Sequence, residues 1–224
     1  MASTRLGDAF SLVFGAWGTR PLAKRIVTVV ALLMLIAGAG LIAYPTVTDL
    51  YSSRQQQQLA SEFTSSEFKT QFASGSIVPG QVLSRIEIPA IRVEALFVEG
   101  TEGRALRAGA GHYAKTPLPC EEGNVAIAGH RTTFGKPFNR IDELKGGEVI
   151  KLVTPERQCS YRVVIIDSEK SKPRPIPKSA SWITDPGNVS VLNRLPGSML
   201  TLTTCHPKRS AKQRLILRAE LIPA

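Results

Sequence analysis

Residues 199–207 read MLTLTTCHP, the pattern of a β-strand that ends in a cysteine. Apolar and polar side chains alternate along the run, as they do in a strand with one buried face. Pro207 follows Cys205 by two residues and cannot continue a central strand, so we expect the strand to stop there. The pattern therefore predicts a thiol at a strand end, beside a loop, where a substrate can reach it.

Six other short runs have the texture of strands and lie between clusters of Gly, Pro and Asn: 82–88, 92–98, 124–130, 149–154, 160–167 and 215–221. Short helical patterns cover 103–108 and 138–144, and the three prolines of Lys172–Pro177 indicate a loop. Many short strands with few helical patterns are typical of a closed β-barrel or a sandwich. We therefore predict one mainly β domain over residues 82–224.

An uncharged run, Ile26–Thr48, precedes this domain. A helix of about 20 apolar residues can cross the roughly 30 Å hydrocarbon core of a bilayer. Four basic residues and one acid stand before the run, which favours a cytoplasmic N-terminal segment over residues 1–25 and export of the rest. We predict a transmembrane helix at 26–48. A cleaved signal peptide stays open as the alternative, although its apolar core is usually shorter.

Residues 49–81 are polar and rich in Gln and Ser. Phe63, Phe68 and Phe72 recur in them at roughly helical spacing. Ser74-Gly75-Ser76 and Pro79-Gly80 then break the pattern. We expect a partly helical juxtamembrane stalk that lifts the β domain off the membrane.

The composition leaves several classes of partner open. The chain has 224 residues, 43% of them hydrophobic, and a formal net charge of +10. A basic chain suits nucleic acid, an anionic membrane or an anionic polymer such as cell wall, and charge alone does not choose among them. The three cysteines lie too far apart for a zinc motif. In an exported domain, Cys120 and Cys159 are candidates for a disulfide worth about 3–4 kcal/mol; two free thiols are the alternative.

A nucleophilic cysteine needs a partner that takes its proton or lowers its pKa. The chain has three histidines, and His130 ends a second apolar strand whose end can meet that of Cys205. His206 neighbours Cys205 on an extended strand, so its side chain points to the other face. His112 follows glycines in an expected loop. Arg214 opens the strand after Cys205, where it can stabilise an oxyanion.

Each of these residues taken alone has an ordinary structural explanation. A lone cysteine in a strand is usually a small buried hydrophobe, a lone histidine is usually structural, and a lone arginine is usually solvated. Their joint position at three strand ends favours an acyl-transfer site. The pattern leaves open another cysteine peptidase or transpeptidase, and a non-enzymatic, membrane-tethered β domain that binds cell-wall polymer.

The sequence resembles the sortase family of cysteine transpeptidases. Residues 201–205 match the signature Thr-Leu-x-Thr-Cys, His130 matches the position of the sortase histidine, and Arg214 that of its arginine. The strings at 129–135 and 205–208 resemble class E sortases of actinobacteria. The resemblance covers about Val82–Leu221 and the N-terminal anchor. It implies a closed eight-stranded barrel with short helices, preceded by one transmembrane helix.

The resemblance also implies a reaction. Cys205 would attack the Thr–Gly bond of a C-terminal Leu-Ala-x-Thr-Gly or Leu-Pro-x-Thr-Gly signal on a secreted protein. An amine of a peptidoglycan precursor would resolve the thioacyl enzyme, with His130 as acid and base and Arg214 on the carbonyl oxygen. This implies a thiol hydrolase and transpeptidase at the cell membrane of a Gram-positive bacterium. We expect no cofactor, no metal and no nucleic acid.

Further substrate contacts follow from the resemblance with less support from the residues. Thr204 directly precedes the nucleophile and is a candidate to bond the substrate or the backbone. His112 and Tyr113 lie in a stretch that resembles the segment beside the class E substrate groove. The loop Glu169–Asp185 corresponds to the one that contacts the sorting motif.

Overall fold

The structure, a computed structural model, describes residues 21–165, 174–175 and 180–223. It divides into two units, Met1–Tyr44 and Pro45–Ala224. The helices are α2 (Pro21–Thr64), α3 (Ser66–Ala73) and α4 (Gly103–Ala108), with single 3-10 turns at Pro89–Ile91, Ile141–Glu143 and Val189–Leu192. The strands are β1 (Val82–Ile88), β2 (Val93–Glu99), β3 (Ala110–His112), β4 (Gly123–Gly129), β5 (Val149–Val153), β6 (Gln158–Val164), β7 (Arg174–Pro175), β8 (Trp182–Thr184), β9 (Ser198–His206) and β10 (Gln213–Leu221).

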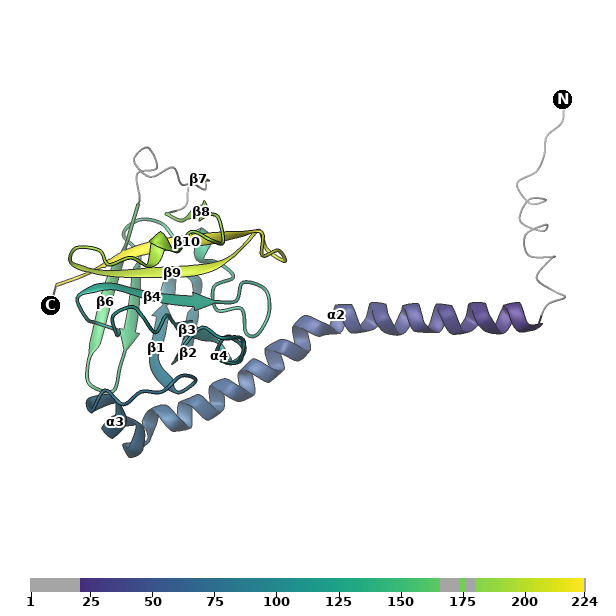
Figure 1. Ribbon diagram of the computed structural model, residues 1–224, viewed down its shortest axis with the longest axis horizontal. Coiled ribbons are helices and arrows are strands. Elements are labelled where there is room, and N and C mark those ends of the chain that lie inside the picture. The colour runs from purple at the N-terminus through teal and green to yellow at the C-terminus, as the bar shows by residue number, and fades with distance from the viewer. Residues whose placement is uncertain (1–20, 166–173, 176–179, 224) are drawn as a thin grey trace, which may run out of the picture. The chain divides into compact units, whose positions relative to one another are not determined.

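Eight of the strands close into a barrel, as the family resemblance implies (Figure 1). Their order is β6-β5-β1-β2-β3-β4-β9-β10, and pairing of β6 with β10 completes the ring. β8 pairs with β10 outside the ring. The barrel is filled by fully buried aliphatic and aromatic side chains, among them Phe97, Phe138 and Tyr161. Closure leaves no free edge in the ring, and the site is built where three of its strands end.

The seven predicted strands appear as β1, β2, β4, β5, β6, β9 and β10, with small shifts at their ends. The predicted helix at 103–108 is α4, whereas 138–144 contains only the 3-10 turn Ile141–Glu143. Phe138, Ile141 and Leu144 are all fully buried, and their spacing of three residues fits the 3-10 period. The predicted loop Lys172–Pro177 lies outside the described residues except for β7. The sequence did not predict β3 and β8, which are three residues each.

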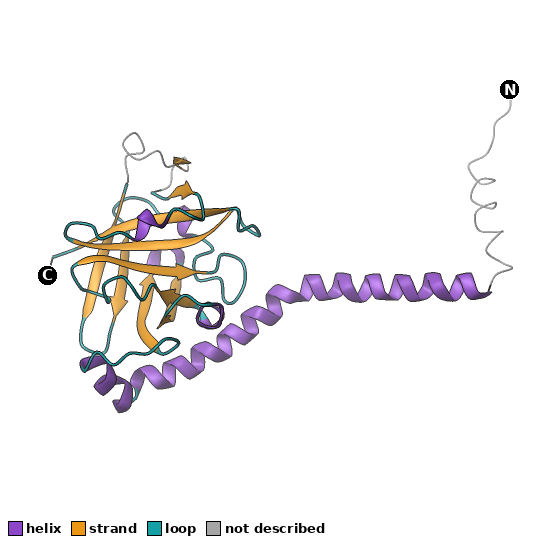
Figure 2. Cartoon of the chain, in the orientation of Figure 1, coloured by secondary structure: helices purple, strands orange, loops and turns teal. Residues whose placement is uncertain are grey.

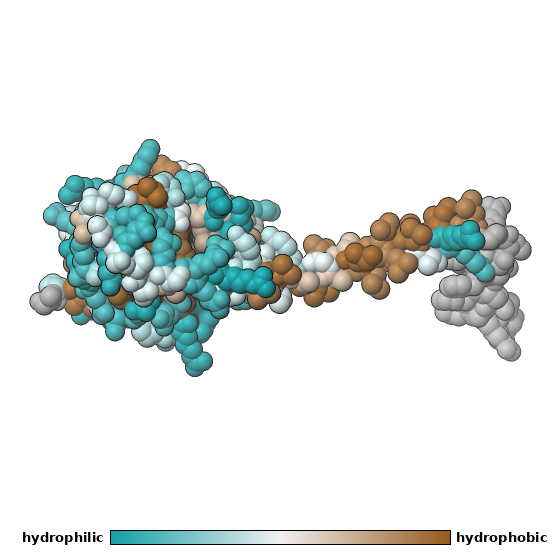
Figure 3. All heavy atoms as spheres, turned by 90° about the horizontal axis from the view of Figure 1, so that it is seen from below, coloured by the Kyte–Doolittle hydropathy of each residue, from teal (hydrophilic) through white to brown (hydrophobic). Residues whose placement is uncertain are grey.

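The first unit contributes the apolar part of α2. Its long side chains are exposed, from Leu22 through Ile42, and appear brown in Figure 3. Among the described residues, α2 is the one helix long and apolar enough to cross a membrane by length and composition. The predicted cytoplasmic segment 1–25 lies outside the described residues up to residue 20.

The segment expected to form a partly helical stalk contains the end of α2 and all of α3, and both pack against the barrel (Figure 2). Leu59 and Phe68 are 7% and 1% exposed and form a second core cluster with Val82, Leu96 and Val98. The spacing of the phenylalanines explains the packing, because it gathers them on one side: Phe68 contacts the rings of both Phe63 and Phe72. Burial of large apolar side chains stabilises this docking by roughly 1.5–3 kcal/mol each.

Polar contacts fix the position of the second half of α2 on the barrel. Gln56 accepts the Leu96 backbone N–H and donates to the carbonyl oxygens of Leu96 and Ala108. Glu62 accepts the Val82 N–H at 3.3 Å. Residues 45–73 therefore belong to the second unit as a docked helical pair.

Cys120 and Cys159 are joined by a disulfide in the structure. It links the loop before β4 to β6, 39 residues further along the chain. The Tyr161 hydroxyl accepts the Cys120 N–H next to it, and burial raises the pKa of Tyr161 to about 12. Cys205 is a free thiol.

Candidate active site

The β9–β10 hairpin sets Cys205 beside Arg214. The two strands pair antiparallel over eight positions, and Cys205 lies directly opposite Arg214. Side chains directly opposite each other in an antiparallel pair point to the same face. Leu200 and Leu202 point into the barrel core, so Cys205 and Arg214 point to its outer face, where both are partly exposed.

The β4–β9 pair sets His130 beside Cys205. These strands run parallel, and their last paired residues are Ala128 and Thr203. The Thr204 hydroxyl then donates to the Gly129 carbonyl oxygen at 2.7 Å, which extends the same register by one step. The same register, continued one step further, matches His130 with Cys205, and neighbouring strands lie about 4.8 Å apart. The strand alternation puts His130 on the outer face as well.

His130 lies in a partly buried environment. Its ring packs on that of Phe134, with centroids 5.1 Å apart. Burial lowers the pKa of His130 below its ordinary value of 6.5, because a low dielectric disfavours the imidazolium. The neutral ring, which can accept a proton from a thiol, is therefore the main form at neutral pH.

Arg131 links the loop after β4 to the end of β9 through side-chain contacts. It is 3% exposed and forms an ion pair with Asp142 at 2.7 Å. It also donates to the Cys205 carbonyl oxygen at 3.4 Å and to Nδ1 of His206 at 2.8 Å. Because a guanidinium only donates, His206 must accept at Nδ1 and carry its proton on Nε2. Burial, followed by the charge of Arg131, lowers the pKa of His206.

A pocket of about 190 Å³ lies next to these strand ends on the outer face. Its walls include Thr203, Arg214 and Ile216 from β9–β10, Tyr113, and residues of the segment 184–192. The Arg214 guanidinium donates to the carbonyl oxygens of Ala211 and Gln213 at one side of it. The lining mixes apolar side chains such as Val191 and Ile216 with polar groups, among them the Arg214 guanidinium, which suits a peptide with small apolar side chains and a carbonyl oxygen to be held.

The additional substrate candidates have different surroundings. Tyr113 lines the pocket, and its hydroxyl bonds to that of Thr203 at 3.0 Å. Thr204 is 3% exposed, and its hydroxyl donates a hydrogen bond to the Gly129 carbonyl oxygen. Within the segment Glu169–Asp185, residues 174–175 and 180–185 are described, and Thr184 borders the pocket.

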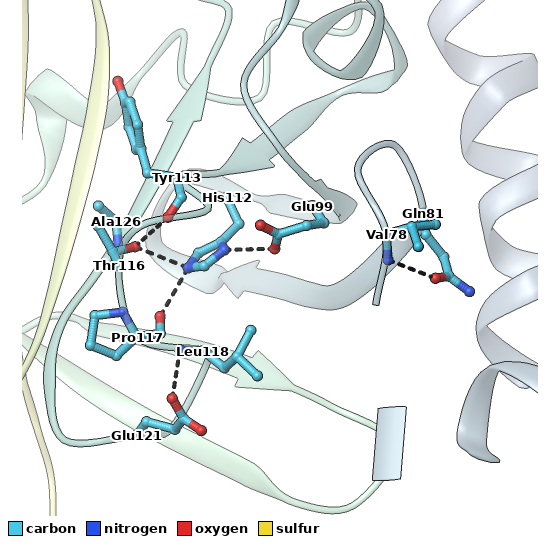
Figure 4. Close-up of polar contacts among 10 residues, drawn as sticks. All are labelled: Val78, Gln81, Glu99, His112, Tyr113, Thr116, Pro117, Leu118, Glu121 and Ala126. Carbon is cyan, nitrogen blue, oxygen red and sulfur yellow. Dashed lines mark hydrogen bonds and ion pairs between the residues drawn. The ribbon is translucent and has the colours of Figure 1, made fainter. Parts of the chain in front are cut away.

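His112 lies below the surface, in a polar cluster drawn in Figure 4. It is 1% exposed, and its Nδ1 contacts a Glu99 carboxylate oxygen at 2.7 Å. Its Nε2 donates to the Pro117 carbonyl oxygen at 2.9 Å and lies 3.0 Å from the Thr116 hydroxyl. Both ring nitrogens have protein partners, so His112 braces the turn that follows Tyr113. A direct contact with substrate would require that cluster to open.

Several residues of the site escaped the sequence prediction. Thr203 and Ile216 line the pocket because strand alternation turns them outward, a signal that the predicted strands 199–207 and 215–221 contain. Arg131 directly follows His130 in the sequence, but nothing in the sequence shows that its side chain passes to β9. Phe134 lies four residues after His130 in the sequence, and only the conformation of the loop brings the two rings into contact.

The arrangement can perform nucleophilic acyl transfer. The strand register assigns a thiol, an imidazole and a guanidinium to one face of the barrel, near a pocket of about 190 Å³. These groups are the types that nucleophilic attack, general acid and base catalysis and oxyanion stabilisation require. No metal-binding cluster of His, Cys, Asp and Glu occurs within residues 21–165, 174–175 and 180–223.

Comparison with known proteins identifies this architecture. The family model of the sortase domain matches residues 86–222. Sortase SrtE1 of Streptomyces coelicolor is 31% identical over 190 residues, which is 78% of this chain and 50% of the relative. The chain thus spans half the length of that relative.

Two solved structures agree with the match. The sortase D5 transpeptidase of Clostridium perfringens has a TM-score of 0.61 at 27% identity and covers 77% of this chain and 99% of its own. Sortase E1 of Streptomyces coelicolor, with a tripeptide in its active site, has a TM-score of 0.55 at 32% identity and covers 66% of this chain and 91% of its own. The chain therefore belongs to the sortase family.

Proposed function

We propose that this chain is a membrane-anchored, class E-like sortase that transfers secreted proteins to the cell wall through a thioacyl intermediate on Cys205. The observation that carries the proposal is the register of three neighbouring strands. Arg214 pairs with Cys205 on one side, and the β4–β9 pairing brings His130 to it on the other. The family match supports the same three roles.

In the first half-reaction, Cys205 reacts as the thiolate, with its proton on His130, and the sulfur forms a bond to the threonine carbonyl carbon of the sorting signal. The Thr–Gly bond breaks, and the imidazolium form of His130 gives its proton to the leaving glycine amine. The lowered pKa of His130 means that a minor fraction of the enzyme holds this proton at neutral pH. Arg214 exchanges its bonds to the Ala211 and Gln213 carbonyl oxygens for the oxyanion.

In the second half-reaction, an amine of a peptidoglycan precursor attacks the thioester. His130 accepts a proton from this amine, and the Cys205 thiolate leaves. Water in place of the amine gives hydrolysis. The substrate is a Leu-Ala-x-Thr-Gly or Leu-Pro-x-Thr-Gly signal, whose apolar residues suit the pocket between Tyr113 and Ile216.

We assign supporting roles to the other candidates. Tyr113 contacts the peptide from the pocket wall, and His112 stabilises the turn that follows Tyr113. Thr204 acts through the backbone of Gly129. The apolar part of α2 anchors the enzyme as a single-pass protein with its N-terminus in the cytoplasm, which the basic residues before it favour.

The test uses the full chain in detergent micelles with a fluorogenic sorting peptide and an amine acceptor. We expect amine-dependent product with the wild type and none with Cys205→Ala. Paired peptides that differ only in Ala or Pro at the second motif position report the class preference, with faster turnover expected for Ala. Equal turnover by the wild type and Cys205→Ala would refute the nucleophile assignment.

A further inference from the structure

The loop that follows His130 has an unusual backbone. Phe134, Gly135 and Lys136 all have positive φ, at 51°, 72° and 40°. This left-handed conformation is unfavourable for residues that carry a Cβ, and it persists where surrounding contacts hold it. The strained triplet includes Phe134, whose ring lies against the ring of His130.

The contacts that hold the triplet come from α2, in the turns just after the apolar run. Asp49 accepts the Gly135 backbone N–H at 3.0 Å and pairs with Lys136 Nζ at 2.6 Å. Tyr51 meets the Phe134 ring edge-on, with centroids 6.3 Å apart. Ser52 is buried and packs so closely on Gly135 that a Cβ there would lie 2.8 Å from its hydroxyl.

The barrel does not fill the space beside this loop. A pocket of about 490 Å³ separates the loop from Ile91 and Arg92 of the barrel, and Asp49 and Ser52 of α2 also line it. Hydrogen bonds within the loop and at its neck run from the Lys136 N–H to Thr133, from the Phe138 N–H to His130, and from Asn139 to the carbonyl oxygens of Lys136 and Arg131. Support for the triplet from outside the loop therefore comes from α2.

We propose that Asp49 is a positioning residue for catalysis: it holds the 134–136 loop so that Phe134 fixes the ring of His130 toward Cys205. The juxtamembrane part of α2 is then a component of the active site, and not only a tether. This inference rests on the proposed function for its kinetic consequence. Its structural consequence, the orientation of His130, is independent of any activity.

The kinetic arm compares full-length variants in detergent. Asp49→Ala is expected to lower kcat on the order of tenfold with little change in KM, because the peptide pocket lies on β9–β10. Asp49→Asn keeps an acceptor for the Gly135 N–H and is expected to recover most of kcat. Lys136→Met removes an exposed ion pair and is expected to have an effect of less than about twofold.

The matched control is Glu62→Ala, which removes another contact of α2 with a barrel backbone N–H, at Val82. It tests whether undocking of the helix alone lowers activity. A loss of kcat equal to that of Asp49→Ala would overturn the proposal, because the effect would then not be specific to the His130 loop. Unchanged kcat in Asp49→Ala would overturn it as well.

The spectroscopic arm uses the imidazole signals of the three histidines, with His130 assigned through His130→Gln. In the wild type, the Phe134 ring should shift the His130 ring protons by its ring current. Asp49→Ala should move these signals toward free histidine values while those of His112 stay in place. If the His130 signals do not move in Asp49→Ala, the positioning role is contradicted. If they move although the wild type has no transpeptidase activity, the positioning role stands and only the proposed function fails.

Discussion

The two sides of the site are held in different ways. Cys205 and Arg214 lie within the β9–β10 pairing, where backbone hydrogen bonds determine which residue faces which. His130 lies beyond the last paired residues of β4 and β9, and its position depends on side chains: Thr204, Arg131 and the contacts of α2 with its loop. The nucleophile side is thus built by topology, and the base side by residues distant in sequence. We expect the base side to be the more adjustable part of the enzyme.

The largest expected effect tests the choice of base. His130→Gln should lower kcat/KM by about 10²–10⁴, because general acid and base catalysis contributes this much. His206→Gln is the matched control, since His206 is bonded to Arg131 on the other face of the strand. Steady-state kinetics on both variants measures the difference. A deeper loss in His206→Gln would show that the base was assigned to the wrong histidine.

The next effect tests the topological side. Arg214→Ala should lower kcat by about 10²–10³, the usual result of removing one oxyanion donor. Arg214→Lys should recover only part of this loss, because an ammonium lacks the planar fork of donors. The control is Arg218→Lys, also on β10, whose guanidinium lies over the Trp182 ring. Full activity of Arg214→Ala would remove the oxyanion role from the mechanism.

A smaller effect tests the link between the two sides. Arg131→Met removes the donor to the Cys205 carbonyl oxygen and leaves Asp142 without its partner. We expect kcat to fall by about 10- to 100-fold, because a small displacement of reacting groups is costly. Arg140→Met, which breaks an exposed pair with Glu143, should change kcat by less than about twofold. Similar kcat values for the two variants would contradict the link.

The smallest effect concerns stability. Burial lowers the pKa of both His130 and His206, so the unfolded chain binds protons more readily than the folded one. The contribution of the two neutral histidines to the free energy of unfolding is fully present above pH 6.5, their ordinary pKa. It is lost as the pH falls through 6.5 toward their lower pKa values in the folded protein. Urea unfolding across pH 5–8 should show stability that decreases below about 6.5. His206→Gln should flatten this decrease, and an increase of stability on acidification would contradict the sign.

The same contrast explains what the sequence could predict. The strand that carries Cys205 alternates, and the strand before His130 is a continuous apolar run, so the barrel and the three residues follow from local pattern and the family resemblance. β3 escaped because Gly109 and Gly111 resemble a loop, and its pairing with β2 and β4 is non-local. The docking of α2 escaped for a related reason. The residues around Gln56 are polar, so no apolar pattern in the sequence predicts that they pack on the barrel. The Gln56 side-chain amide nevertheless bonds to backbone groups of Leu96 and Ala108.

The most direct test of the central claim is to trap the thioacyl enzyme. Full-length protein is mixed with a sorting peptide in the absence of an amine, quenched in acid, and its intact mass is measured. We predict a mass increase equal to the peptide acyl fragment up to Thr, located on the peptide that contains Cys205 and released by hydroxylamine. The adduct should be missing from Cys205→Ala. An adduct that persists in that variant, or its absence from a wild type that turns over the peptide, would contradict the account.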